Sequence, residues 1–133
     1  MRRIATILIL AATLSACGGG SAGGGTTIEL TASDSGSAKL AKVGDRIVIS
    51  LEANPTTGYG WQQAPGLDDS VVRFVSEDYQ QAPASPNMVG VGGIDTLTYQ
   101  AVGEGTTTIA LVYLRSGDTT AAQSFTVTVT VAQ

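Results

Sequence analysis

Few side chains in this 133-residue sequence could do covalent or acid–base chemistry. It contains no histidine and a single cysteine, Cys17. Without an imidazole, neither a Ser-His-Asp nor a Cys-His site can form, and the usual nitrogen ligands for zinc or copper are missing. A lone cysteine also cannot close an internal disulfide. These counts exclude the commonest hydrolytic sites.

The remaining candidates for catalysis do not converge. Adjacent carboxylates occur at Asp68-Asp69 and Glu77-Asp78. Neighbours on a strand point to opposite faces, so we interpret both pairs as solvated loop charges rather than as acid–base pairs. The glycine-rich stretch 90–93 lacks the Lys-Ser/Thr of a phosphate-binding loop. The sequence therefore predicts a binding protein that is not an enzyme and uses no metal or cofactor.

The first 25 residues are typical of an export signal followed by a tether. Arg2 and Arg3 precede an apolar run, too short to span a bilayer, that ends in Leu-Ser-Ala-Cys at Cys17. This ending resembles the bacterial lipobox, whose cysteine is acylated; the alternative is a plain signal peptide with an incidental cysteine. The glycine-rich segment after it cannot bury apolar surface. We expect a lipoprotein signal peptide at 1–16, a lipidated Cys17 within a Gly/Ser tether at 17–25, and a folded domain at 26–133.

This organisation implies a protein held by its lipid at the bacterial cell envelope. The glycine after Cys17, in place of aspartate, favours the outer membrane by the sorting rule of enteric bacteria. Loss of Arg2 and Arg3 with the signal would take the formal net charge from −4 to −6. An acidic domain with scattered basic residues has no electrostatic footprint for nucleic acid. We expect a monomer with a protein partner.

The rest of the sequence has the period of β-strands. Apolar and polar residues alternate along 47–52, 96–101 and 124–131, which predicts half-buried strands. The run 109–114 is continuously apolar and predicts a central strand covered on both faces; 27–31 and 71–75 are further candidates. Turn signals separate these segments. Six to eight short strands without a helical stripe favour an all-β fold, an immunoglobulin-like antiparallel β-sandwich.

Three loops of this sandwich could form a binding edge. The first, 54–60, reads Asn-Pro-Thr-Thr-Gly-Tyr-Gly, where proline fixes φ, and its two glycines permit conformations closed to other residues. The second, 80–93, is long and ends in the glycine cluster; the third lies near 115–120. Alternate connections emerge at the same end of such a sandwich. We therefore expect the first and third loops to lie together, and the second to join them.

The motif Asn-Pro-Thr-Thr-Gly-Tyr precedes Trp61, and Gly-Val-Gly-Gly follows at 90–93. Together these motifs resemble the chagasin family of cysteine peptidase inhibitors. The resemblance covers 26–133. It implies an immunoglobulin-like fold whose three loops enter the active-site cleft of a papain-like peptidase, with reversible inhibition. By this resemblance the first loop would cover the catalytic cysteine, and the glycines would lie along one side of the cleft. The implied peptidase-binding residues are Asn54, Pro55, Thr56, Thr57, Gly58, Tyr59, Gly90, Val91, Gly92, Gly93 and Arg115.

The third motif departs from the family pattern. The family carries Arg-Pro followed by Trp or Phe, whereas Arg115 is followed here by Ser116-Gly117-Asp118. Two alternatives stay open at individual residues: Tyr59 and Trp61 could be core residues that cap the sandwich, and Arg115 could be a solvated charge at a strand end. The alternative function is an envelope-anchored adhesion or assembly module that uses the same sandwich without inhibiting a peptidase.

Overall fold

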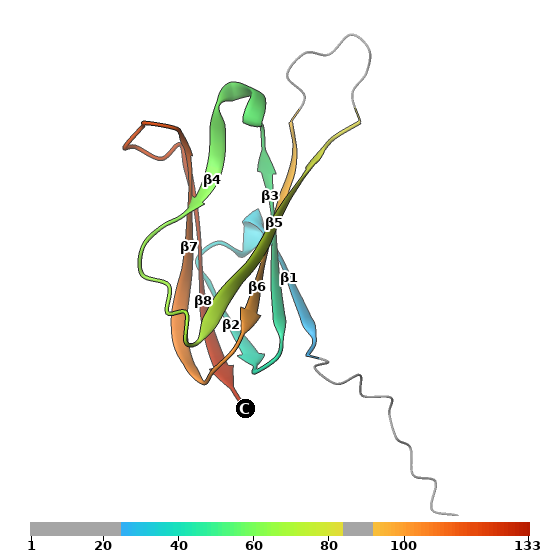
Figure 1. Cartoon of the computed structure of the whole chain (residues 1–133), viewed down its shortest axis with the longest axis vertical. Helices are drawn as coiled ribbons and strands as arrows, with labels where there is room; N and C mark the ends of the chain where they lie inside the picture. Colours follow the sequence, from blue (N-terminus) through green and yellow to red (C-terminus); the bar gives the residue numbers. More distant parts are fainter. Residues whose placement is uncertain (1–24, 84–91) are drawn as a thin grey trace, which may run out of the picture.

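The computed structural model describes residues 25–83 and 92–133. The predicted signal peptide, Cys17, Gly90 and Val91 lie outside the described residues. The described chain folds into two four-stranded sheets packed face to face (Figure 1). One sheet has the order β1-β3-β6-β5 and the other β2-β8-β7-β4. The first sheet is built from β1 (Thr27–Thr31), β3 (Arg46–Ala53), β6 (Gly93–Ala101) and β5 (Val72–Gln81). The second is built from β2 (Ser37–Lys42), β8 (Gln123–Ala132), β7 (Gly105–Arg115) and β4 (Tyr59–Gln63).

The alternating residues meet between the sheets and confirm the predicted sandwich. Most of the buried apolar side chains come from every second position of the central strands, among them Ile47, Ile49, Leu51, Leu97, Tyr99, Ile109, Leu111, Phe125, Val127 and Val129. Each such aliphatic or aromatic side chain contributes about 1.5–3 kcal/mol when it leaves water. The core therefore follows directly from the period of two.

Two features of the sheets differ from the expectation. Most neighbours pair antiparallel, but β1 pairs parallel to β3 and β2 pairs parallel to β8. The run 109–114 lies in β7, which is central in its sheet as predicted. Its outer face is only half-buried, so the prediction of burial on both faces was wrong. The outer face stays partly open because each sheet of a sandwich is covered by the other sheet on one side alone.

Strand β5 also extends further than the sequence indicated. It runs to Gln81, so the second loop begins at Ala82 rather than at Gln80. Glu77 and Asp78 consequently stand on this edge strand and not in a loop, and the loop interpretation of that pair was wrong. Asp68 and Asp69 do lie in the exposed turn region before β5.

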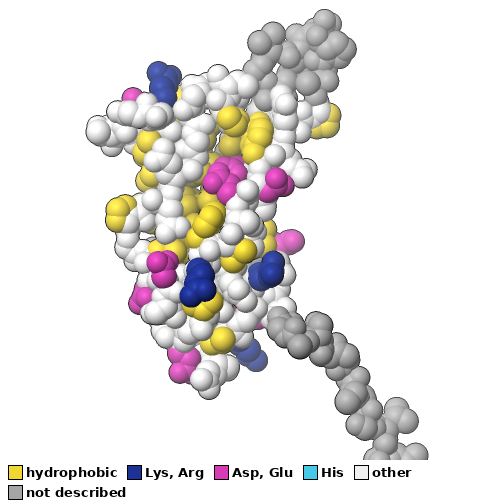
Figure 2. All heavy atoms as spheres, in the orientation of Figure 1, with side chains coloured by type: hydrophobic (Ala, Val, Ile, Leu, Met, Phe, Trp, Pro, Cys, Tyr) yellow, Lys and Arg dark blue, Asp and Glu magenta, His cyan; other side chains and the backbone are white. Residues whose placement is uncertain are grey.

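Surface charge on the described residues is mixed. On the face drawn in Figure 2, Lys and Arg side chains are interspersed with Asp and Glu and form no continuous basic area. Within residues 25–83 and 92–133, no helix is long and apolar enough to cross a membrane.

Candidate functional site

The first loop is a tight turn closed on its own backbone. A 3-10 turn, η2 (Pro55–Thr57), joins β3 to β4. The Asn54 carbonyl accepts both the backbone N–H of Thr57, at 3.1 Å, and the Thr57 hydroxyl, at 2.6 Å. The Gly58 N–H donates to the Pro55 carbonyl at 2.9 Å, and Gly58 has a φ of +83°, which glycine adopts without strain. These bonds fix the turn before any partner arrives.

The hydroxyls of Thr56 and Thr57 are both used inside the loop. The Thr56 hydroxyl donates to Asn54 Oδ1 at 2.5 Å, and the Thr57 hydroxyl is used by the turn. Gly60 differs from the expectation: it is not among the glycines with positive φ, which in this loop is Gly58 alone. The side chains at the tip are small and exposed, and their polar atoms stabilise the loop itself.

A column of stacked side chains supports this loop from the opposite sheet. The rings of Trp61 and Tyr113 lie 5.0 Å apart between centroids, and those of Tyr113 and Tyr59 lie 5.4 Å apart at an interplanar angle of 24°. The guanidinium carbon of Arg115 lies 5.0 Å from the centre of the Tyr59 ring, a cation–π arrangement. Strands β4 and β7 thus supply a continuous column behind the loop.

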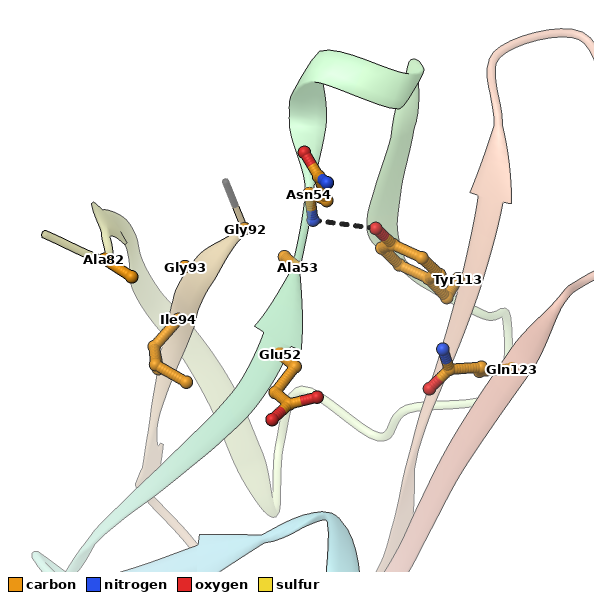
Figure 3. A pocket seen from close by; sticks show the side chains of 9 residues that line it. All are labelled: Glu52, Ala53, Asn54, Ala82, Gly92, Gly93, Ile94, Tyr113 and Gln123. Carbon is orange, nitrogen blue, oxygen red and sulfur yellow. Dashed lines mark hydrogen bonds between the residues drawn. The ribbon is translucent and has the colours of Figure 1, made fainter. Parts of the chain in front are cut away.

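This column is hydrogen-bonded to the end of β3. The Tyr113 hydroxyl accepts the backbone N–H of Asn54 at 2.8 Å (Figure 3). The indole N–H of Trp61 donates to the Glu52 carbonyl at 3.0 Å. Trp61 and Tyr113 are 7% and 8% exposed, so both polar tips are satisfied inside the molecule. The core interpretation of Trp61 was therefore correct, while Tyr59 is half-buried at the rim of the core.

Arg115 is exposed but held in place. Its side chain covers Tyr59, and an added Cβ on Gly58 would lie 3.5 Å from Arg115 Cγ. The residues after it form a turn in which the Asp118 N–H donates to the Arg115 carbonyl at 2.9 Å, with Gly117 at a φ of +93°. The first and third loops therefore contact each other, as expected.

The described end of the second loop packs against the base of the first. Ala53 pairs with Gly93 in the β3–β6 ladder. A Cβ on Gly92 would lie 3.1 Å from the Ala53 carbonyl oxygen, and one on Gly93 would lie 2.1 Å from the Gln80 carbonyl oxygen. Glycine is required at Gly93 by this close approach of backbones. Of the predicted site residues, the structure brings together 54–59, Gly92, Gly93 and Arg115.

A hollow of about 440 Å³ lies between the loops (Figure 3). It is lined by Glu52, Ala53, Asn54, Ala82, Gly92, Gly93, Ile94, Tyr113 and Gln123. Among the described residues, no cluster of His, Cys, Asp or Glu could hold a metal ion. Tyr113 and the Glu52 carbonyl were not predicted as parts of this site. The available signal was a tyrosine at an inward position, whose hydroxyl requires a partner when it is buried.

Comparison with known proteins agrees with this arrangement. Residues 40–131 match a family model described as Chagasin family peptidase inhibitor I42. Chagasin from Trypanosoma cruzi is 26% identical over 102 residues, which cover 74% of this chain and 93% of chagasin. The structure of the cysteine protease inhibitor EhICP2 from Entamoeba histolytica superposes with a TM-score of 0.71 at 26% identity, covering 80% of this chain and 96% of that one. The structure of PbICP-C in complex with falcipain-2 superposes with a TM-score of 0.54 at 18% identity, covering 82% of this chain and 93% of that one. This match is a likeness in fold.

The family match spans most of the described domain, and it includes all three loops that the sequence singled out. The immunoglobulin-like sandwich is shared with these structures, and the prediction that the chain is not an enzyme is confirmed by the inhibitory role of the family. The chain belongs to the chagasin family of peptidase inhibitors and is a cysteine peptidase inhibitor.

Proposed function

We propose that the chain inhibits papain-like cysteine peptidases reversibly, by placing its three loops in the active-site cleft. The observation that carries this proposal is the first loop, a narrow tip of exposed small residues whose hydroxyls and carbonyls are already bonded to one another. A loop fixed in its bound shape loses little conformational entropy on docking. Rigidity also holds its peptide bonds away from the geometry of nucleophilic attack, so the loop obstructs the site without being cleaved.

In this arrangement the first loop covers the catalytic cysteine, through Asn54, Pro55, Thr56, Thr57, Gly58 and Tyr59. The second segment, Gly90, Val91, Gly92 and Gly93, lies along one side of the cleft, and Arg115 lies on the other side. The column from Trp61 to Arg115 supports the first loop from behind, because its hydroxyl and indole hydrogen-bond the end of β3. The complex of PbICP-C with falcipain-2 provides a precedent for an inhibitor of this fold bound to a peptidase.

The test is an inhibition assay with the purified protein and papain. We expect residual activity to fall with inhibitor concentration and to return on dilution, with no cleaved inhibitor visible by mass spectrometry. Cleavage within 54–60, or activity that does not return, would contradict reversible obstruction. Absence of inhibition against papain and against several cathepsins would favour the adhesion or assembly module instead.

We also propose that Cys17 carries a lipid that holds the protein at the bacterial cell envelope. Thr26 is bound to Asp45 at the end of the sandwich opposite to the three loops, which supports an anchor on that side (Figure 1). Metabolic labelling with a fatty acid should mark the parent protein and leave Cys17→Ser unlabelled. Label that persists on the serine variant would disprove acylation at this residue.

A further inference from the structure

Asp95 is a carboxylic acid inside the sandwich. It lies on β6 two residues after Gly93, at a position that points inward, and it is 4% exposed. The other buried polar side chains among the described residues are bonded: Asp45 accepts the N–H groups of Thr26 and Lys42, and the Thr107 hydroxyl accepts that of Asp68. By contrast, Asp95 Oδ1 has no hydrogen-bond partner among the described residues.

The groups around Asp95 are acidic or neutral. Edge strand β5 places Tyr79 opposite Asp95 and Glu77 opposite Leu97, so Glu77 is the diagonal neighbour of Asp95 on the same face of the sheet. The charges of Glu77 and Asp78 both act on Asp95. On the other side, β3 places Leu51 opposite Asp95. Strand β4 has no charged residue, and Arg115 at the end of β7 is stacked on Tyr59. Two neighbouring carboxyl groups repel when both are charged, which favours the protonated form of the buried one.

Electrostatics agrees with this geometry. Burial and the nearby charges of Glu77 and Asp78 raise the pKa of Asp95 from 3.8 to about 7. The folded state therefore binds this proton more tightly than the unfolded chain does. The stability that the proton contributes is complete below the unfolded pKa of 3.8 and is lost progressively as the pH rises to about 7.

The proton matters for the second loop because β5 is an exposed edge strand, paired on one side alone. The first half of β5 is anchored by buried Val72 and by Phe74, which lies edge-on to Tyr99 at 5.5 Å. A register shift between Phe74 and Ser76 follows, and every residue from Arg73 to Gln81 is exposed. Beyond this shift, Glu77 faces Asp95 diagonally across the ladder, three residues before Gln80 packs against Gly93.

We propose that Asp95, which faces Glu77 diagonally across the β5–β6 ladder, acts as a proton-dependent clamp on this hairpin; the clamp holds Gly92 and Gly93 against the first loop in acid and weakens as Asp95 ionises. When Asp95 is charged, Glu77 and Asp78 repel it across the hairpin. The second half of β5 then separates more readily from β6, and Gly92 loses its fixed place beside Ala53. The effect on inhibition rests on the proposed function; the effect on the hairpin does not.

The first test measures the hairpin. Thermal unfolding is followed between about pH 5 and 8, where Asp34, Asp45 and Asp68 stay ionised because hydrogen bonds lower the pKa of each. We expect the melting temperature of the parent to fall over this range. The melting temperature of Asp95→Asn, whose neutral amide can donate to Glu77, should change much less. Glu104→Gln, an exposed carboxylate in the turn at the opposite end, is the matched control and should follow the parent. Amide exchange at Gly92 and Gly93, corrected for intrinsic base catalysis, should accelerate in the parent and in Glu104→Gln but not in Asp95→Asn.

The second test measures inhibition of papain as a ratio. Dividing the inhibition constant of the parent by that of Asp95→Asn at each pH cancels the titration of the enzyme. We expect this ratio to rise several-fold from pH 5 to 8. Parallel stability curves for the parent and Asp95→Asn would overturn the clamp. A changed stability curve with a constant ratio would overturn its action on the binding edge. If neither protein inhibits papain, the proposed function fails, and the exchange rates of Gly92 and Gly93 decide the clamp.

Discussion

The hydroxyl of Tyr113 accepts the backbone N–H of Asn54 at 2.8 Å, across the gap between the two sheets. Asn54 is the first residue of the binding motif, and Tyr113 stacks between Tyr59 and Trp61. One hydrogen bond thus connects the start of the first loop to the aromatic column that supports its end. Removal of that bond should affect the loop more than the fold.

Tyr113→Phe keeps the ring and removes the acceptor. The hydrogen bond should contribute about 1 kcal/mol to stability, and its loss should increase the dissociation rate of a peptidase complex because the loop becomes less fixed. Tyr99→Phe is the matched control: it removes a hydroxyl bonded to Gln63 at 3.0 Å, in the core and away from the loops. Surface plasmon resonance with papain measures both. Equal dissociation rates for the two variants would contradict a positioning role for Tyr113.

Thr57→Arg tests whether the tip enters a narrow cleft. The side chain is exposed, so arginine has room in the free protein but not in a complex. Its hydroxyl bond to Asn54 is lost as well, so we expect a modest destabilisation of about 1 kcal/mol together with a large loss of inhibition. Thr57→Ser keeps the hydroxyl and should inhibit like the parent. An arginine variant that inhibits equally well would place the tip outside the cleft.

Gly58 and Gly60 form a matched pair two residues apart. Gly58→Ala forces a side chain into the left-handed region at φ +83° and should cost about 1 kcal/mol or more. The added Cβ itself meets Arg115 at an ordinary 3.5 Å, so the strain lies in the backbone. Gly60→Ala has open space around its Cβ and no positive φ, and it should be neutral in a thermal melt. Similar melting temperatures for the two variants would contradict this turn geometry.

The turn after Arg115 limits how the missing family motif can be restored. With Gly117 at φ +93° and the turn closed onto Arg115, proline is favoured at Ser116 and glycine at Gly117. Ser116→Pro alone should therefore keep or raise the melting temperature. Addition of Gly117→Trp should lower it, by about 1 kcal/mol or more in stability. Calorimetry of the single and double variants tests this, and a double variant as stable as the parent would show that the turn can change its conformation.

Much of the fold was predictable because the core follows a local pattern. The alternation around Ile49 and Val127 places every second residue inward, and the structure confirms it. Parallel pairing of β1 with β3 was not predictable, since it depends on which strands meet and not on their composition. The tip was predictable as a stiff turn, yet the hydrogen bonds of Thr56 and Thr57 required coordinates. Asp95 was missed because one polar residue at an inward position resembles a break in the pattern.

Strand β3 joins the two ends of the molecule. It begins at Arg46, next to the hydrogen bond that Asp45 accepts from the Thr26 N–H, and it ends at Ala53, next to the first loop. Its pairing with β1 is parallel, so a force that pulls Thr26 away from the loops loads the β1–β3 hydrogen bonds in shear rather than one by one. A peptidase held at the loops and an attachment at Thr26 would thus pull along one strand. Tension between the two ends of the sandwich would therefore be shared by all the β1–β3 hydrogen bonds at once.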